Sequence, residues 1–136
     1  MPVPAGDFSL ILKKSAAGRI LVVDDEPLVR WSIAETLRTA GYDVVEAGDA
    51  DSALHALIEE RQPPDAILLD LRLPDCADLH LLETIKLIRP GTPVVLMTAF
   101  GTPELAADAR GLGAYAVLEK PFDLTVLVPL LDSATT

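Results

Sequence analysis

Three acidic residues follow a short apolar run near the start of the chain, in the segment RILVVDDEP (residues 19–27). Asp24, Asp25 and Glu26 carry like charges that repel one another, and burying any of them without a partner is costly. Carboxylate oxygens are also the ligands that hard cations prefer, and Mg²⁺ is often held by one or two carboxylates together with water. The triplet therefore predicts a cation site. The alternative for Asp25 or Glu26 is a cap on the helix that follows.

Three further polar residues each end an apolar run later in the chain. Asp70 ends the run in AILLDLRLPD, Thr98 the run in VVLMTAFG, and Lys120 the run in AVLEKPF. If these runs are neighbouring parallel strands, their ends meet at the edge of the sheet where ligands bind in open α/β folds. Carboxylates, a hydroxyl and an ammonium group in one place suit a phosphoryl group, with Asp70 as nucleophile and Lys120 and a metal offsetting charge. Taken singly, Asp70 and Thr98 also fit turns, and Lys120 fits a solvated charge.

The elements that must position these groups alternate regularly along the chain. Short runs that are apolar on both faces, as in parallel strands covered on both sides, span residues 20–23, 44–47, 66–69, 94–97 and 115–118. Helical spacing predicts helices over about 29–40, 51–60, 79–88, 103–111 and 123–133, the last kinked or shortened by Pro129. Five such units with right-handed crossovers predict an α/β fold of flavodoxin-like (βα)5 type, a doubly wound parallel five-stranded sheet.

Composition argues against several other classes of protein. The chain has 136 residues and a formal net charge of −10, so it offers no basic stripe for a nucleic acid. No run approaches the roughly 20 apolar residues of a membrane span. The single cysteine, Cys76, cannot form an internal disulfide, and we therefore expect a cytoplasmic protein. We expect residues 1–18 to form a flexible arm and residues 19–134 to form one domain.

The four strand-end motifs VVDDEP, LLDLRLPD, MTAFG and EKPF, in this order and spacing, resemble the receiver domain of two-component response regulators. The resemblance covers residues 19 to about 133. It implies the strand order 2-1-3-4-5. It also implies that Asp70 accepts a phosphoryl group from the phosphohistidine of a histidine kinase, in a phosphorelay that depends on Mg²⁺ (or Mn²⁺).

The same resemblance assigns a role to each residue of the site. It implies that the metal is held by Asp24, Asp25, Asp70 and the main-chain carbonyl of Arg72. It implies that the hydroxyl of Thr98 and the ammonium of Lys120 contact the phosphoryl group, and that the Lys120–Pro121 peptide bond is cis. The acidic triplet is then tolerable because a cation offsets the repulsion, with Glu26 outside the metal's ligand shell.

Three positions depart from the family pattern or tune it. Val117 stands where the family usually has an aromatic residue that moves with the hydroxyl residue on activation. Arg72 and Phe100, two residues beyond Asp70 and Thr98, occupy positions that in the family tune the lifetime of the phosphoryl group. A bulky Phe100 could shield the acyl phosphate from water, which predicts slow self-hydrolysis.

Two rival functions deserve comparison. A phosphatase of the haloacid-dehalogenase type would need an acid two residues after its nucleophile, where this chain has Arg72. A receiver-like interaction module that no longer depends on phosphorylation remains the alternative, because Val117 leaves room for it. We expect the chain not to be an enzyme, apart from supporting its own Mg²⁺-dependent phosphotransfer and autodephosphorylation.

The expected partners follow from the resemblance. They are a sensor histidine kinase or phosphotransfer protein, and an output domain or partner protein. A homodimer would use the face formed by the helix from residue 103, the strand 115–118 and the helix from residue 123. We expect this chain to bind neither nucleic acid nor a membrane. The stretches RWSIAETLRTAGYDV and TAFGTPE resemble receivers attached to sigma-54-dependent transcription activators.

Overall fold

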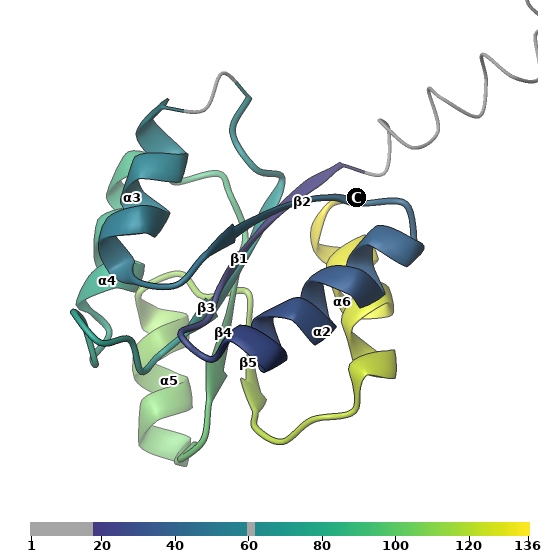
Figure 1. The fold of residues 1–136 in the computed structure, drawn as a ribbon. Helices are drawn as coiled ribbons and strands as arrows, with labels where there is room; N and C mark the ends of the chain where they lie inside the picture. Colours follow the sequence, from purple (N-terminus) through teal and green to yellow (C-terminus); the bar gives the residue numbers. More distant parts are fainter. Residues whose placement is uncertain (1–17, 60–61) are drawn as a thin grey trace, which may run out of the picture.

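The computed structural model describes residues 18–59 and 62–136, so residues 1–17 of the expected arm lie outside the described part of the chain. Within these ranges, five parallel strands form one sheet in the order β2-β1-β3-β4-β5 (Figure 1). The strands are β1 (Arg19–Val23), β2 (Asp43–Ala47), β3 (Ala66–Asp70), β4 (Val94–Thr98) and β5 (Ala116–Glu119). The predicted fold class and strand order are confirmed.

The described residues also contain five α-helices that cover both faces of the sheet. They are α2 (Pro27–Thr39), α3 (Ala50–Glu59), α4 (His80–Ile88), α5 (Pro103–Gly111) and α6 (Leu127–Ala134). Helices α3, α4 and α5 lie on one face, and α2 and α6 lie on the other (Figure 1). None of the described helices is long and apolar enough to cross a membrane.

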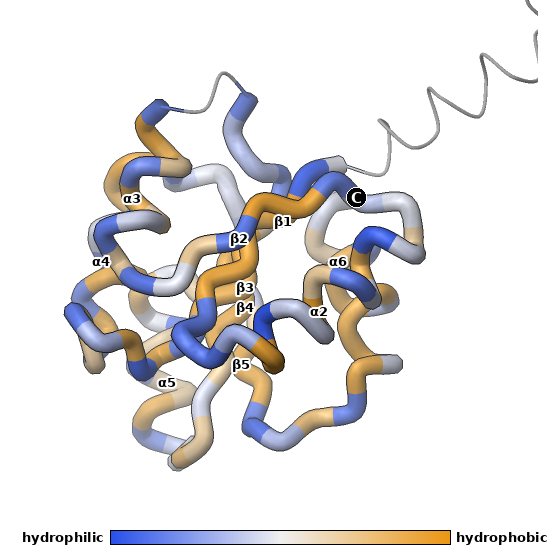
Figure 2. Tube along the Cα trace, viewed as in Figure 1, coloured by the Kyte–Doolittle hydropathy of each residue, from blue (hydrophilic) through white to orange (hydrophobic). Residues whose placement is uncertain are grey.

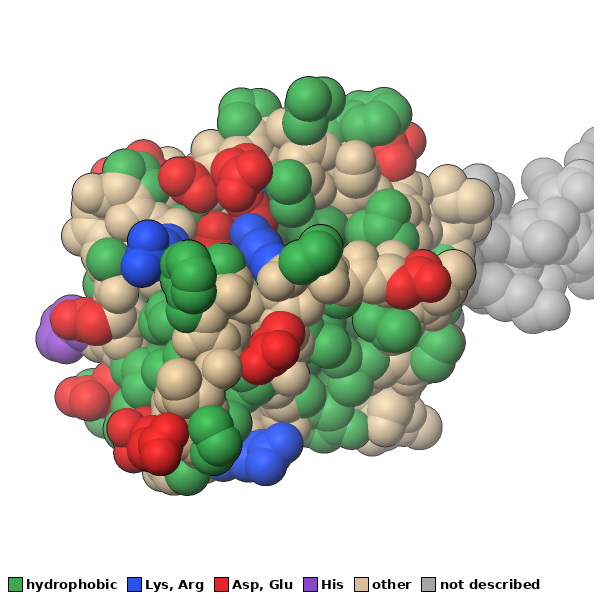
Figure 3. All heavy atoms as spheres, turned by 90° about the horizontal axis from the view of Figure 1, so that it is seen from below, with side chains coloured by type: hydrophobic (Ala, Val, Ile, Leu, Met, Phe, Trp, Pro, Cys, Tyr) green, Lys and Arg blue, Asp and Glu red, His purple; other side chains and the backbone are tan. Residues whose placement is uncertain are grey.

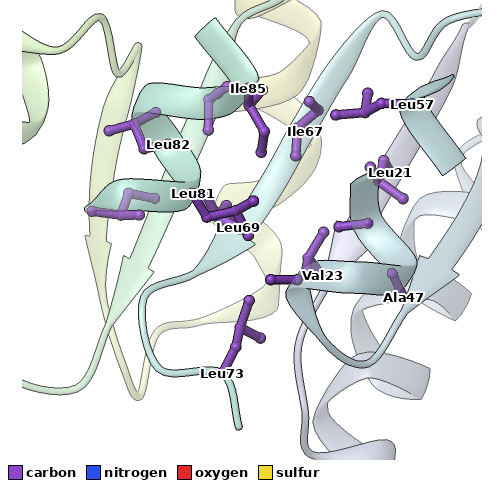
Figure 4. Packing of buried hydrophobic residues seen from close by; sticks show 14 of the residues in the cluster. Leu21, Val23, Ala47, Leu57, Ile67, Leu69, Leu73, Leu81, Leu82 and Ile85 are labelled. Carbon is purple, nitrogen blue, oxygen red and sulfur yellow. The ribbon is translucent and has the colours of Figure 1, made fainter. Parts of the chain in front are cut away.

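Each face of the sheet carries its own apolar core, because successive side chains of a strand point in opposite directions. Strand β1 contributes Leu21 and Val23 to the core under α3 and α4, and Ile20 and Val22 to the core under α2 and α6. Figure 4 shows the first core, where side chains of β1, β3, α3 and α4 lie together. Figure 2 shows the same strands as a continuous apolar centre. This close-packed centre is a rigid platform for the residues at the strand ends.

Helices α2 and α5 end in the same backbone motif. After α2, Gly41 adopts a φ of 100° and donates its N–H to Arg38, while Tyr42 donates to Leu37. Glycine is favoured there because a side chain is strained at positive φ. The predicted end of this helix near residue 40 is therefore confirmed. Gly113 (φ 102°) ends α5 in the same way, with bonds from Gly113 to Arg110 and from Ala114 to Ala109.

The last helix begins later than its sequence pattern predicts. Asp123 caps a short 3-10 helix, η1 (Leu124–Val126), by accepting a hydrogen bond from the N–H of Thr125, and α6 starts only at Leu127. Pro129 therefore lies in the first turn of α6, where its missing N–H removes no helical bond. The prediction of one continuous helix from Asp123 was therefore wrong about where the helix begins, while the alternative of a helix shortened near Pro129 agrees with α6.

Candidate metal centre at the strand ends

Three carboxylates meet where β1 and β3 end. The two strands pair in parallel with Val23 opposite Leu69, so the residues that follow Val23 lie beside Asp70. Oxygen atoms of Asp24, Asp25 and Asp70 lie within 4.8 Å of one another. Asp24 is 0% exposed and Asp70 is 5% exposed, while Asp25 is open to solvent. Figure 3 views the molecule from below, where the strands end, and shows acidic side chains gathered beside a basic one.

Lys120 joins two of these carboxylates from the end of β5. Its Nζ lies 2.6 Å from Oδ2 of Asp24 and 3.2 Å from Oδ2 of Asp70. Burial by itself lowers the pKa of the Lys120 ammonium, but the hydrogen bonds and charges of Asp24 and Asp70 outweigh burial and raise it. Lys120 is therefore a fixed positive charge at neutral pH.

The environment of Asp70 works against its ionised form. Burial is the largest effect and raises the pKa of the Asp70 carboxyl, and the charge of Asp24 adds to the rise. The N–H of Arg72, 3.1 Å from Oδ1, and the Lys120 ammonium act in the opposite direction without cancelling it. An added cation would stabilise the charged form of this carboxylate. The donor set, three carboxylates at one point, has the hard oxygen chemistry that suits Mg²⁺ or Mn²⁺.

Thr98 ends β4, between the strands that carry Asp70 and Lys120. It is 3% exposed, and its main-chain oxygen accepts a 2.7 Å hydrogen bond from the N–H of Lys120. Its hydroxyl oxygen accepts a 3.2 Å bond from the N–H of Phe100. The sheet order thus brings β1, β3, β4 and β5 side by side, with all the strand-end groups at one edge (Figure 1).

The comparison with known families decides what this arrangement is. Residues 20–132 match the model of the response regulator receiver domain. The chain belongs to this family. The family prediction made from the four strand-end motifs is therefore confirmed.

Relatives of this receiver domain are bacterial regulators. The chain is 36% identical over 119 residues to the transcriptional regulatory protein PdtaR of Mycobacterium tuberculosis, covering 87% of this chain and 57% of PdtaR. It is 35% identical over 120 residues to the regulatory protein AtoC of Escherichia coli, covering 88% of this chain and 26% of AtoC. The chain thus spans a little over half of one relative and about a quarter of the other.

A solved structure of the receiver domain of NtrX from Brucella abortus superposes with a TM-score of 0.78 at 38% identity. The match covers 85% of this chain and 97% of that one. Similarity to NtrX and to NtrC-type regulators is consistent with the predicted resemblance to receivers of sigma-54-dependent activators.

The other residues singled out from the sequence are Arg72, Phe100, Val117 and the Lys120–Pro121 bond. The Lys120–Pro121 peptide bond is cis. The guanidinium carbon of Arg72 lies 5.0 Å from the centre of the Phe100 ring, and Phe100 is 69% exposed. Val117 is partly buried against the core under α3, α4 and α5. The structure therefore places Arg72 and Phe100 together, and Val117 at the margin of this core.

One residue at the site escapes the motif analysis. Arg30 of α2 donates from Nη1 to the main-chain oxygen of Asp24 over 2.7 Å. The sequence does hold a signal for it, because a cation close to the N-terminus of a helix opposes the helix dipole. A partner is therefore expected to offset this unfavourable interaction, although the sequence does not identify it.

Proposed function

We propose that this receiver domain accepts a phosphoryl group on Asp70 from the phosphohistidine of a histidine kinase or phosphotransfer protein. We propose that Asp24, Asp25, Asp70 and the main-chain carbonyl of Arg72 hold the Mg²⁺ or Mn²⁺ on which the transfer depends. One observation carries the proposal: three carboxylates converge within 4.8 Å, and Lys120 bonds two of them.

The proposed transfer is a nucleophilic displacement at phosphorus. A carboxylate oxygen of Asp70 forms a bond to phosphorus while the bond from phosphorus to the imidazole nitrogen breaks, and the nitrogen keeps the electron pair. Lys120 offers a positive charge, and the Thr98 hydroxyl a hydrogen bond, to the phosphoryl oxygens. A bound Mg²⁺ would supply further positive charge against these oxygens.

An apolar groove beside the site supports the proposed phosphodonor partner. The groove has a volume of about 520 Å³ and lies between α2 and the loop after β5. Leu28 of α2, which is 79% exposed, Phe122 and Leu124 line it, and Lys120 lies at the same groove. Exposed apolar surface next to a reactive group suits a helix of the phosphodonor that docks by its apolar face.

We further propose that Arg72 and Phe100 slow the loss of the phosphoryl group. The stacked side chains come from the loops that follow β3 and β4, the strands that end in Asp70 and Thr98. A ring and a guanidinium held together there would limit the approach of water to an acyl phosphate on Asp70. Val117 provides no aromatic ring for switching, and the aromatic residue that we propose to act beside Thr98 is Phe100, whose N–H bonds the Thr98 hydroxyl.

The remaining proposals concern the whole protein. We propose that the receiver switches an output domain or partner protein in transcription regulation, and that it acts as a phosphoacceptor rather than as a turnover enzyme. Residues 19–134 would form the receiver, residues 1–18 an arm, and α5, β5 and α6 a face for homodimers. The lone cysteine supports a cytoplasmic location. The relatives' names and the signalling role of the family carry these statements.

The test is the intact mass of the protein after incubation with acetyl phosphate and Mg²⁺. We expect one phosphoryl adduct, absent from Asp70→Asn and absent when EDTA replaces Mg²⁺. A protein that stays unmodified, under conditions that label another receiver, would contradict the proposal and favour the phosphorylation-independent module. An adduct that persists in Asp70→Asn would place the phosphoacceptor elsewhere.

A further inference from the structure

The first turn of α2 is supported by Pro27, but not by a capping side chain or an acidic residue. Glu26 occupies the N-cap position without a side-chain capping bond, and the first turn contains no acidic residue. Arg30 closes that turn, with its N–H 2.9 Å from the main-chain oxygen of Glu26. A cation so close to a helix N-terminus is unfavourable because it opposes the helix dipole. Some other contact of Arg30 must therefore offset this cost.

The guanidinium of Arg30 makes two such contacts. Nη1 donates to the main-chain oxygen of Asp24 over 2.7 Å, and Nε lies 3.3 Å from Oε1 of Glu46 on β2. The side chain is 22% exposed, so these bonds are partly shielded from water. Asp24 is held from its other side as well, because its carboxylate accepts bonds from the N–H of Glu26 at 2.9 Å and from Lys120 at 2.6 Å.

The loop after β2 lies close to the same guanidinium. A methyl carbon added at Gly48 would lie 3.1 Å from Nη1 of Arg30, tighter than ordinary van der Waals contact. Gly48 therefore lets the backbone approach Arg30 closely. Arg30 thus bonds the end of β1 and strand β2, and it lies close to the loop at Gly48.

We propose that Arg30 is a positioning residue for the metal centre. It fixes the main chain at Asp24, so that the carboxylates of Asp24 and Asp25 face Asp70 before a cation arrives. Pre-ordered ligands bind more tightly because the cost of ordering them is already met by the fold. Groups that orient metal ligands typically change metal affinity 10–100-fold when they are altered. This inference rests on the proposed metal binding and adds to it a residue that touches neither metal nor phosphoryl group.

The charge of Arg30 and its positioning role predict opposite changes in metal affinity when Arg30 is lost, so an experiment can tell them apart. A positive charge near the site repels a cation, so removal of the charge alone would tighten metal binding. Arg30→Lys keeps the charge but loses the planar fork that serves Asp24 and Glu46 together. Arg38→Lys is the matched control, because Arg38 also pairs with Glu46, at 3.2 Å, but makes no bond to Asp24. Gly48→Ala keeps Arg30 but places a methyl group against its guanidinium.

The experiment is a Mn²⁺ titration of the full chain, with free Mn²⁺ followed by electron paramagnetic resonance and with Mg²⁺ as competitor. We expect the Kd to rise about tenfold in Arg30→Lys, to rise less in Gly48→Ala and to stay unchanged in Arg38→Lys. The melting temperature of each variant in EDTA shows whether the fold is intact.

The outcomes separate this inference from the proposed function. A wild-type protein that binds no Mn²⁺ would overturn the metal proposal itself. Wild-type binding together with an unchanged Kd in Arg30→Lys and Gly48→Ala would overturn only the role of Arg30. Equal weakening in Arg30→Lys and Arg38→Lys would assign the effect to Glu46 and would also overturn it.

Discussion

The strand-end edge has two halves that are built differently. In the half formed by β1 and β3, Asp24 is 0% exposed and its carboxylate and main-chain oxygens all accept hydrogen bonds, from Glu26, Lys120 and Arg30. In the half that follows β4, only Thr98 is buried. Phe100, two residues later, is 69% exposed and touches Arg72 through a stacked contact at 5.0 Å.

In the proposed function, this difference separates the groups that carry out the chemistry from those that regulate it. Groups that bind a metal and a phosphoryl group gain from being fixed in advance, because ordering them during reaction would cost free energy. Groups that set the lifetime of the product need only weak contacts, since an exposed cation–π pair contributes about 0.5–1 kcal/mol. Changes in the first half should therefore have large effects, and changes in the second half small ones.

Lys120→Met should have the largest effect. The variant removes the ammonium from Asp24 and Asp70 while keeping a side chain of similar length. We expect the rate of phosphorylation by acetyl phosphate to fall about 100-fold or more, as for loss of other groups that stabilise developing charge. Intact mass against time measures the rate. Lys86→Met is the control, because Lys86 bonds the main-chain oxygens of Pro90 and Thr92 instead. A rate within a few fold of wild type would show that phosphorylation does not depend on the charge of Lys120.

A metal bound at the ends of β1 and β3 should stabilise the folded protein. A cation at 100 times its Kd stabilises the folded state by about 2.7 kcal/mol if the unfolded chain does not bind it. Asp25→Asn should remove most of this gain by weakening the site. In EDTA the same variant should be slightly more stable than wild type, because one repelling charge is gone. Urea unfolding with Mg²⁺ and with EDTA measures both effects. Equal gains in wild type and Asp25→Asn would place the cation elsewhere.

The pKa of Asp70 predicts how metal-free stability depends on pH. Burial raises this pKa in the folded state, so ionised Asp70 destabilises the fold at pH values above the raised pKa. Asp70→Asn should therefore be more stable than wild type at neutral pH in EDTA. The advantage should shrink as the pH falls from the raised pKa to the ordinary value of 3.8, because Asp70 is then protonated in both states. Melting temperatures from pH 7 downward test the direction, and a constant advantage would contradict it.

Phe100→Leu should have the smallest effect. The variant keeps an apolar side chain but removes the ring that stacks with Arg72, a contact of about 0.5–1 kcal/mol. We expect the half-life of the phosphorylated protein to shorten about two- to fivefold, with little change in stability because Phe100 is exposed. Phe100→Ala should shorten it further. A half-life unaltered by Phe100→Ala would remove the proposed shielding.

The fold and the main groups of the site could be predicted because they depend on patterns that are local in the sequence. Runs such as Ile20–Val23 are short and apolar on both faces, which favours strands that are covered on both sides. Parallel strands then place their carboxyl ends at one edge, so Asp70, Thr98 and Lys120 meet whatever the exact strand lengths are. The late start of α6 was missed because periodicity alone does not show that Pro129 suits the first helical turn.

By itself, then, the sequence determined the layered sheet, its family and the edge at which the strand-end groups meet. Which groups touch depends on how the elements pack: Lys120 on both Asp24 and Asp70, Arg72 over Phe100, and Arg30 on the main chain of Asp24. The two kinds of information differ in how far along the chain they act. Hydrophobic period and turn residues act over a few positions, whereas these contacts join side chains from different loops, and their geometry exists only after the helices pack against the sheet.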